Sequence, residues 1–350
     1  MADTRFTALG MSGSGKTCYV LGMYYKMCVG ANGFTLTTTN QDASKLEDWM
    51  DRLDDETGPD RFPSGTTLTE VTDYSFKLNY QNTGIMSFDW VDYGGGTLKA
   101  RENNAGAYNR FNEAIDASTA IYIFIDGELL CDENEQTRIK NVNRKCARVI
   151  NPYITSYLEG HRAMLPPIVF VVTKADLCAP YLKPDEIDSI IKECFSSVFG
   201  NGQLVYITAV TLGNNISDDN YSGDVDPINI HIPFLIGIYH QFLNYCLLLK
   251  NEIDEEENKS RNIISASERE INNQNSKWFF TNKSKIEECR KQINEANDNI
   301  NSNREMLNKY RRLLMAVTGE LQKYSGSGGG FNKYLNGEKN DFTFDEISAI

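Results

Sequence analysis

The chain has 350 residues, 41% of them hydrophobic and 24% charged, so it can bury one large core and carry an appendage. Its formal net charge of −13 argues against binding to nucleic acid or to an anionic membrane, because both require a basic surface. The eight cysteines form no C-x-x-C pair, so we expect neither a zinc site nor a disulfide framework, and a reducing, cytoplasmic setting. The N-terminus has no basic stretch followed by an apolar one, so we expect no signal peptide.

The first motif follows a predicted strand at residues 5–9 and precedes a predicted helix that starts near Cys18. It reads Gly10-Met11-Ser12-Gly13-Ser14-Gly15-Lys16-Thr17 and matches the phosphate-binding pattern G-x-x-x-x-G-K-[ST]. Glycines let the backbone curl so that several N–H groups face one phosphate chain at a helix N-terminus. Lys16 can reach the β- and γ-phosphates, and the Thr17 hydroxyl can ligate Mg²⁺.

The next segment predicts a hairpin. A short strand at 34–39 and a helix at 41–56 come first, followed by a Pro- and Gly-rich loop at 58–67. Strands at 73–80 and 85–91 then end at Asp92-Tyr93-Gly94-Gly95-Gly96.

Two continuous apolar runs predict strands that are buried on both faces, at 119–125 and 168–172. Helical segments precede and separate them at 105–117 and at 132–159, the second bent or restarted near Pro152. The second strand runs into Thr173-Lys174-Ala175-Asp176, and after a helix at 184–199 the last strand ends at Thr208-Ala209-Val210. Alternating strands and helices predict an α/β domain with a mainly parallel sheet, and every motif lies at a carboxyl strand end, where such sheets bind ligands.

Residues 228–249 are apolar and about long enough to span a bilayer. They include polar residues, and their large apolar side chains recur at helical spacing: Leu235, Ile238, Phe242, Tyr245 and Leu249. This pattern favours a buried amphipathic helix over a membrane segment, so we expect no transmembrane segment.

A heptad pattern dominates the C-terminal region. The a positions are Ile286, Ile293, Ile300, Leu307, Leu314 and Leu321, and the d positions are Cys289, Ala296, Asn303, Tyr310, Val317 and Tyr324. Either an antiparallel hairpin within one chain or a coiled coil between two chains fits this pattern. Asn303 and the small Ala296 favour the hairpin. The predicted division is a nucleotide domain at 1–250, a helical arm at 251–325, and a flexible linker and tail at 326–350. The aromatic and acidic residues of the tail at 331–350 indicate either docking or disorder.

The order of the motifs resembles that of the Ras-like GTPases in the translation-factor-related class of P-loop proteins, over about residues 3–250. Residues 62–66, ahead of the hairpin, are similar to the bacterial double-GTPase group of that class. The resemblance implies a P-loop three-layer α/β sandwich, followed here by the helical hairpin or coiled coil, and binding of GTP/GDP with Mg²⁺.

The resemblance also implies residue roles. The loop residues Gly10, Ser12, Gly13, Ser14, Gly15, Lys16, Thr17 and Cys18 would surround the phosphates. Mg²⁺ would be held by Thr17, by Asp92 through water, and by a switch threonine, either Thr66 or Thr67 with a preference for Thr66. The Gly95 N–H would meet the γ-phosphate, so Lys16, Thr66 and Gly95 form the catalytic set.

For the base, the resemblance implies that Asp176 accepts hydrogen bonds from guanine N1 and N2 while the stem of Lys174 covers the ring. A backbone N–H of Thr208-Ala209-Val210 would meet guanine O6.

Two positions depart from the family pattern. Gly96 stands where Ras-like proteins often carry the glutamine that orients water, and Ser12 stands where they often have glycine. We therefore expect slow hydrolysis, or hydrolysis that uses another residue such as Arg101 or Glu102, or a partner.

The predicted function is a GTP/GDP switch that acts on a protein effector or activator, with output or homo-oligomerisation through the arm. The alternatives are a self-assembling dynamin-like GTPase and a non-hydrolysing pseudo-GTPase scaffold. An ATP-driven kinase or ATPase is disfavoured by Asp176.

Overall fold

The computed structural model describes residues 4–55, 61–62, 71–93, 105–161, 165–200, 202–214, 216, 223–276, 283–326 and 329–344. Contacts divide the chain into two units. The first comprises Met1–His240 with Gly319–Phe342, and the second Gln241–Thr318 with Thr343–Ile350.

Over the described residues, the first unit contains a nine-stranded sheet in the order β11-β10-β7-β6-β5-β1-β4-β3-β2. Its central strands run parallel: β7 (Leu204–Ala209), β6 (Ile168–Thr173), β5 (Ala120–Asp126), β1 (Thr4–Gly10) and β4 (Thr83–Tyr93). Antiparallel strands extend both edges: β3 (Val71–Tyr80) and β2 (Phe34–Thr38) on one side, β10 (Phe331–Leu335) and β11 (Glu338–Asn340) on the other. The predicted α/β fold with a mainly parallel sheet is confirmed.

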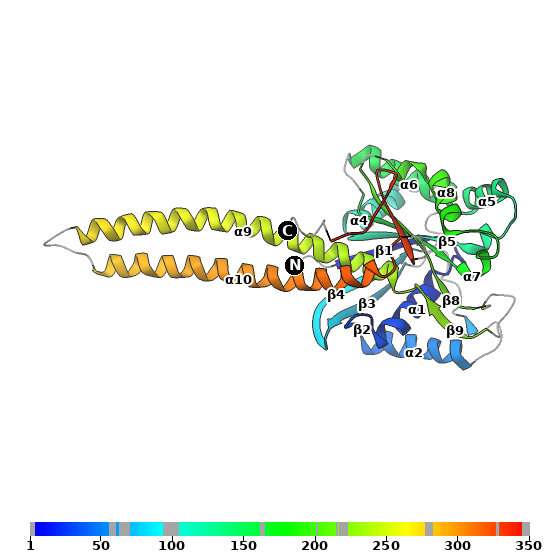
Figure 1. Ribbon diagram of the computed structural model, residues 1–350, viewed down its shortest axis with the longest axis horizontal. Coiled ribbons are helices and arrows are strands. Elements are labelled where there is room, and N and C mark those ends of the chain that lie inside the picture. Colours follow the sequence, from blue (N-terminus) through cyan, green and yellow to red (C-terminus); the bar gives the residue numbers. More distant parts are fainter. Residues whose placement is uncertain are drawn as a thin grey trace. The chain divides into compact units, whose positions relative to one another are not determined.

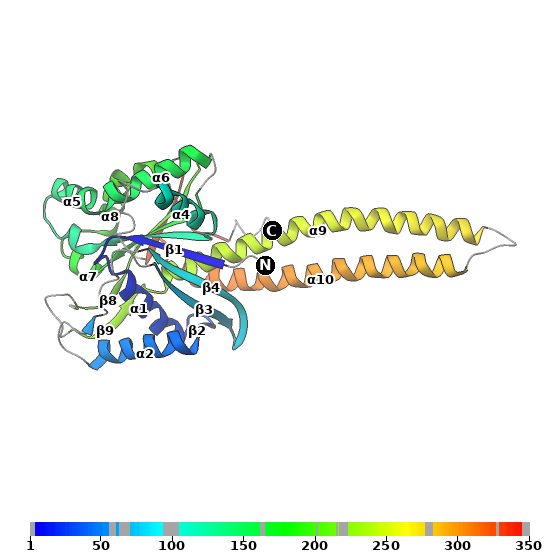
Figure 2. The same ribbon diagram turned by 180° about the vertical axis from the view of Figure 1, so that it is seen from behind.

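Helices cover both faces of this sheet, as Figures 1 and 2 show from opposite sides. One face carries α4 (Ala105–Asp116), α5 (Glu135–Val142), α6 (Arg148–His161) and α8 (Pro184–Cys194), and the other carries α1 (Lys16–Val29) and α2 (Asn40–Asp55). Strand side chains alternate between the two faces. Ile121 and Ile123 of β5 join the core cluster that includes side chains of α4, α5, α6 and α8, whereas the Phe124 ring packs 5.1 Å from that of Tyr19 in α1.

The irregularity predicted near Pro152 lies elsewhere. Asn143–Ala147 form a π-helical turn between α5 and α6, and Pro152 sits inside α6. A proline ring crowds the preceding helical turn and its nitrogen donates no hydrogen bond, so the sequence places the disturbance at the proline. In the structure the helix instead widens into a π-helical turn at Asn143–Ala147, directly before α6.

Residues 331–340 form two strands, so this part of the predicted tail docks on the sheet. β10 pairs antiparallel with β7, whose edge would otherwise present unpaired backbone groups. The carboxylate of Asp188 in α8 accepts hydrogen bonds from Asn332 Nδ2 and Tyr334 Oη, both at 2.6 Å. These buried contacts attach the C-terminal segment to the first unit.

Two long helices form the bulk of the second unit. α9 (Ile232–Asn275) begins in the first unit and continues into the second, and α10 (Lys283–Gln322) returns to the first. Within the second unit the Tyr245 and Tyr310 rings lie 5.0 Å apart, Glu257 pairs with Arg304, and the carboxylate of Glu270 lies 3.1 Å from Lys285 Nζ. The order of these contacts means that α9 and α10 run in opposite directions. Every a and d position of the heptad pattern is buried or half-buried.

α9 contains an 18-residue window of mean hydropathy 1.4 that is apolar enough to cross a membrane, but 67% of that window is buried. Phe234, Leu235 and Ile238 are wholly buried in the first unit. This is weak evidence for a membrane span, because a core helix has the same composition.

The start of α9 approaches β5 so closely that only glycine fits at residue 237. A Cβ there would lie 2.1 Å from Tyr122 Oη and 2.9 Å from the Phe6 ring, and the same Tyr122 hydroxyl donates to the Pro233 carbonyl at 3.2 Å.

We expect Gly237→Ala to lower the free energy of unfolding by about 1–3 kcal/mol through overpacking. The matched control is Gly160→Ala, at an exposed helical position with open space around it, which should be neutral or slightly stabilising. Equal urea midpoints for the two variants would contradict the expectation.

Candidate functional site

The loop between β1 and α1 has the curled backbone that its glycines predict. Gly13 and Gly15 have φ of 81° and 76°, in the region that favours glycine. The Ser14 N–H donates to the Met11 carbonyl at 3.1 Å, which closes the turn. A Cβ on Gly15 would also lie only 3.2 Å from side-chain atoms of Thr173. Gly15 is thus required both by its backbone conformation and by the close approach of β6.

Lys16 is buried in the first turn of α1, with 5% of its surface exposed. Its ammonium group donates to the carbonyls of Gly10 at 3.0 Å and Met11 at 3.2 Å, and lies 3.8 Å from Asp92 Oδ1. Parallel pairing of β1 with β4 sets Ala8 opposite Asp92 and so brings the carboxylate to the loop. Burial lowers the pKa of Lys16, and burial raises the pKa of Asp92 to about 6 despite the nearby ammonium. Pairing therefore compensates only part of the desolvation of the two charges.

The site offers oxygen groups suited to Mg²⁺ and phosphate. Asp92 Oδ1 and Ser14 Oγ are buried without a hydrogen-bond partner among the described residues, and Thr17 is half-buried at the start of α1. Mg²⁺ prefers oxygen ligands and usually takes one or two from the protein and the rest from phosphate and water. Within the described ranges, no three His, Cys, Asp or Glu side chains gather as a metal site of their own. The residues present thus fit a Mg²⁺ ion shared with a nucleotide.

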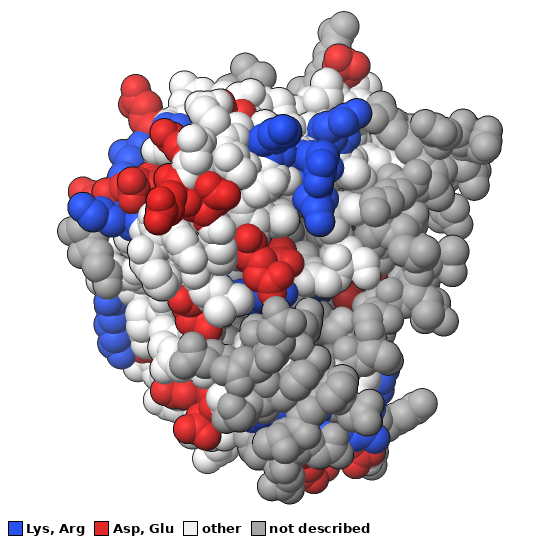
Figure 3. Space-filling model, turned by 90° about the vertical axis from the view of Figure 1, so that its right-hand side faces the viewer, with Lys and Arg blue, Asp and Glu red and all other residues white. Residues whose placement is uncertain are grey.

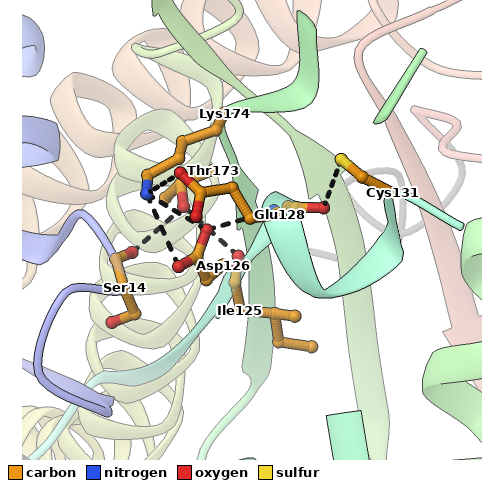
Figure 4. Close-up of polar contacts among 8 residues, drawn as sticks. Ser14, Ile125, Asp126, Glu128, Cys131, Thr173 and Lys174 are labelled. Carbon is orange, nitrogen blue, oxygen red and sulfur yellow. Dashed lines mark hydrogen bonds and ion pairs between the residues drawn. The ribbon is translucent and has the colours of Figure 1, made fainter. Parts of the chain in front are cut away.

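Thr173 joins three parts of the site at the end of β6. Its hydroxyl lies 3.0 Å from the Ser14 carbonyl oxygen and 3.3 Å from that of Ile125 in β5, as Figure 4 shows. The next peptide is also fixed, because the Ala175 N–H donates to the Val210 carbonyl at 3.1 Å. The phosphate loop, the end of β5 and the 173–176 loop therefore form one connected edge.

Lys174 has left-handed backbone angles (φ 50°) and lies beside the turn that follows β5. Its ammonium lies 2.6 Å from Glu128 Oε1 and 3.4 Å from Asp126 Oδ1. Asp126 also caps the short helix η3 (Gly127–Leu130) by accepting from the Glu128 N–H at 3.1 Å. Burial raises the pKa of Asp126, and the charge of Lys174 counteracts the rise. Sequence reasoning missed both acidic residues, although they directly follow a buried strand.

Asp176 contacts Thr211, which the motif analysis also missed. The Thr211 hydroxyl donates to Asp176 Oδ1 at 2.7 Å from β8 (Thr211–Gly213), a strand paired with β9 (Val225–Ile228). The side chain of Thr208 is buried, and its hydroxyl donates to the Gly330 carbonyl at 2.7 Å. This side chain therefore binds the C-terminal segment. The Ala209 carbonyl accepts from Asn229 Nδ2 at 3.3 Å. A role for the 208–210 backbone at guanine stays a prediction.

The structure brings the loop residues, Asp92 and 173–176 to the carboxyl edge of the sheet, with Ser12 exposed and Cys18 half-buried. Thr66, Thr67, Gly95, Gly96, Arg101 and Glu102 lie outside the described residues. Figure 3 views the side of the molecule on which α5 and α7 (Ala175–Cys178) lie in Figure 1. Acidic and basic side chains lie beside one another at the upper left of this view, and a further basic group stands apart near the top.

Comparison with known proteins places the N-terminal part of the chain close to one family of GTPases. The model of the family Double-GTPase 1 matches residues 7–151, which confirms the resemblance to P-loop GTPases of the double-GTPase type. No curated protein matches. Among solved structures the chain is similar to the GTPase-like domain of S. cerevisiae Ski7 bound to GTP, at 14% identity and a TM-score of 0.32. That match covers 64% of this chain and 48% of the other, so the chain spans about half of its length.

The raised pKa of Asp92 predicts a pH dependence of stability in the nucleotide-free protein. A carboxyl with a pKa of about 6 when folded and about 3.9 when unfolded holds its proton more tightly in the folded state. Its contribution is therefore greatest below about pH 4 and is lost as the pH rises to about 6, a change of about 3 kcal/mol. Urea unfolding at pH 4, 5, 6 and 7 should show that wild type loses stability relative to Asp92→Asn over this window. A difference that does not vary with pH would contradict the assignment.

Proposed function

We propose that the protein is a Mg²⁺-dependent guanine-nucleotide switch that binds GTP and GDP and hydrolyses GTP slowly on its own. The carrying observation is the contact of Thr173 with Ser14, which joins the phosphate loop to the loop that holds Asp176. One bound nucleotide could then reach both loops. The family match over residues 7–151 supports GTP binding.

Base choice would rest on Asp176. A carboxylate can accept from both guanine N1 and N2, whereas adenine presents no such pair of donors. The Thr211 hydroxyl, 2.7 Å away, would hold the carboxylate in one orientation. At the other end Lys16 would exchange its carbonyl partners for phosphate oxygens, while Asp92 and Thr17 would hold Mg²⁺, which neutralises charge on the phosphates when bound.

We propose that the helical arm is the output element. The segments just before and just after the arm both contact the end of β7, since Asn229 donates to the Ala209 carbonyl and Gly330 accepts from Thr208. A change in residues 208–210 would therefore reach the segment before α9 and the segment after α10. α9 contacts α10 within the chain and the heptad positions are not exposed, which favours binding of a protein effector over self-pairing through residues 286–321.

The second candidate is a pseudo-GTPase scaffold that binds nucleotide without turnover. Gly96 favours it, because a glycine supplies no side chain to orient the attacking water. Both candidates share the nucleotide site and the cytoplasmic setting proposed for the protein, and differ only in hydrolysis.

Selectivity can be tested through Asp176. The wild type should bind GDP far more tightly than ADP in a fluorescence titration with Mg²⁺. Asp176→Asn should shift preference toward xanthine nucleotide, because one carboxylate acceptor becomes an amide donor. As a control, Lys16→Ala should weaken triphosphate binding for every base, by about 2–4 kcal/mol. Equal affinity of the wild type for GTP and ATP would overturn the proposal.

Turnover tests the switch against the scaffold. Unassisted hydrolysis should be near or below the scale of Ras-like proteins, on the order of 10⁻⁴–10⁻³ per second. Phosphate release should be followed over a range of protein concentrations. It should be compared with a variant in which a flexible linker replaces residues 241–318 while residues 319–342, including β10, remain. Fast turnover that is independent of concentration and of the arm would place the catalytic group in the nucleotide domain. No turnover at all would favour the scaffold.

A further inference from the structure

The turn Asp126-Gly127-Glu128 lies directly against the loop that carries Lys174. A Cβ on Gly127 would lie 2.3 Å from the Thr173 carbonyl oxygen and 2.8 Å from that of Lys174, so only glycine permits this approach. The turn therefore brings its two carboxylates to the side of residues 173–176, named the base loop from here on.

Both carboxylates face the ammonium of Lys174. Glu128 Oε1 lies 2.6 Å from Nζ, and Asp126 Oδ1 and Oδ2 lie 3.4 Å and 3.5 Å from it. The Asp126 side chain is fixed by its cap on η3, whereas the Glu128 side chain is 45% exposed and is held by the lysine. Lys174 itself is only 19% exposed, so solvent screens this cluster less than it screens a surface ion pair.

We propose that Glu128, with Asp126 behind it, is a positioning residue for the guanine base. It acts through Lys174, whose ammonium it holds in place so that the hydrocarbon stem keeps one conformation beside the base. This inference rests on the proposed function, because the stem has a role only if a base lies against it. The lysine stem is a flexible chain of four methylene groups. If it is held in place before binding, less conformational entropy is lost when the base binds.

The test is a double-mutant cycle on the affinity for GDP. Glu128→Gln removes the charge at nearly constant size, and Lys174→Met keeps an apolar stem without an ammonium. We expect Glu128→Gln to raise the Kd about 3- to 10-fold in the wild-type background and to have no effect in the Lys174→Met background. Glu128→Asp, which keeps the charge, should restore part of the affinity. Glu133→Gln, at an exposed position of the same acidic region, is the matched control and should leave the Kd unchanged.

A base-free probe separates positioning from general damage. Inorganic tripolyphosphate with Mg²⁺ can occupy only the phosphate loop, so Glu128→Gln should leave its Kd unchanged. Equal weakening of GDP and tripolyphosphate, or additive effects of Glu128→Gln and Lys174→Met, would overturn the inference while the proposed function stands. Failure of the wild type to bind GDP or GTP would overturn both.

Discussion

The buried ammonium of Lys16 is the group on which the rest of the site depends. A buried charge costs several kcal/mol unless other groups compensate it. Here the Gly10 and Met11 carbonyls and the carboxylate of Asp92 surround it, which requires both the curled loop and the parallel register of β1 with β4. Burial lowers the pKa of Lys16 and raises that of Asp92, and both shifts favour the neutral form. The neighbouring groups therefore compensate the loss of hydration only in part. A bound anion together with its cation would stabilise the two buried charges further. The loop is therefore suited to binding such a ligand.

The same edge of the sheet joins parts of the chain that are remote in sequence. Ser14 and Thr173 are 159 residues apart, yet one hydroxyl links them, because β1, β5 and β6 are parallel neighbours whose carboxyl ends coincide. Gly127 adds a second close approach between β5 and the base loop. Backbone contact of this kind couples the loops more tightly than exposed side chains could. A ligand that orders one loop would therefore meet its neighbours already in place.

Sequence reasoning predicted the parts of this arrangement that are local. The apolar runs of β5 and β6, the phosphate loop and the carboxyl-end position of Asp92 all follow from short patterns with a direct physical cause. The missed features are pairings at a distance. Glu128 contacts Lys174, which lies 46 residues later in the sequence. The five-residue strand β10 pairs with β7, from which a long helical insertion separates it in the sequence. No periodicity records such pairings, so the sequence leaves docking and disorder both open for the tail and does not identify the strand that it joins.

After α10 the chain returns to the first unit, so the helical arm is not a C-terminal extension. Residues 241–318 form the bulk of the second unit, and residues 319–342 belong to the first, so the arm is an insertion and not a terminal extension. A truncation after residue 250 would remove β10 as well as the arm and would expose the edge of β7, together with the Thr208 hydroxyl that donates to Gly330. Any loss of nucleotide binding in that truncation would have two causes. A terminal extension can evolve or be lost without touching the sheet, whereas an insertion closed by a strand of the sheet is tied to the stability of the nucleotide domain.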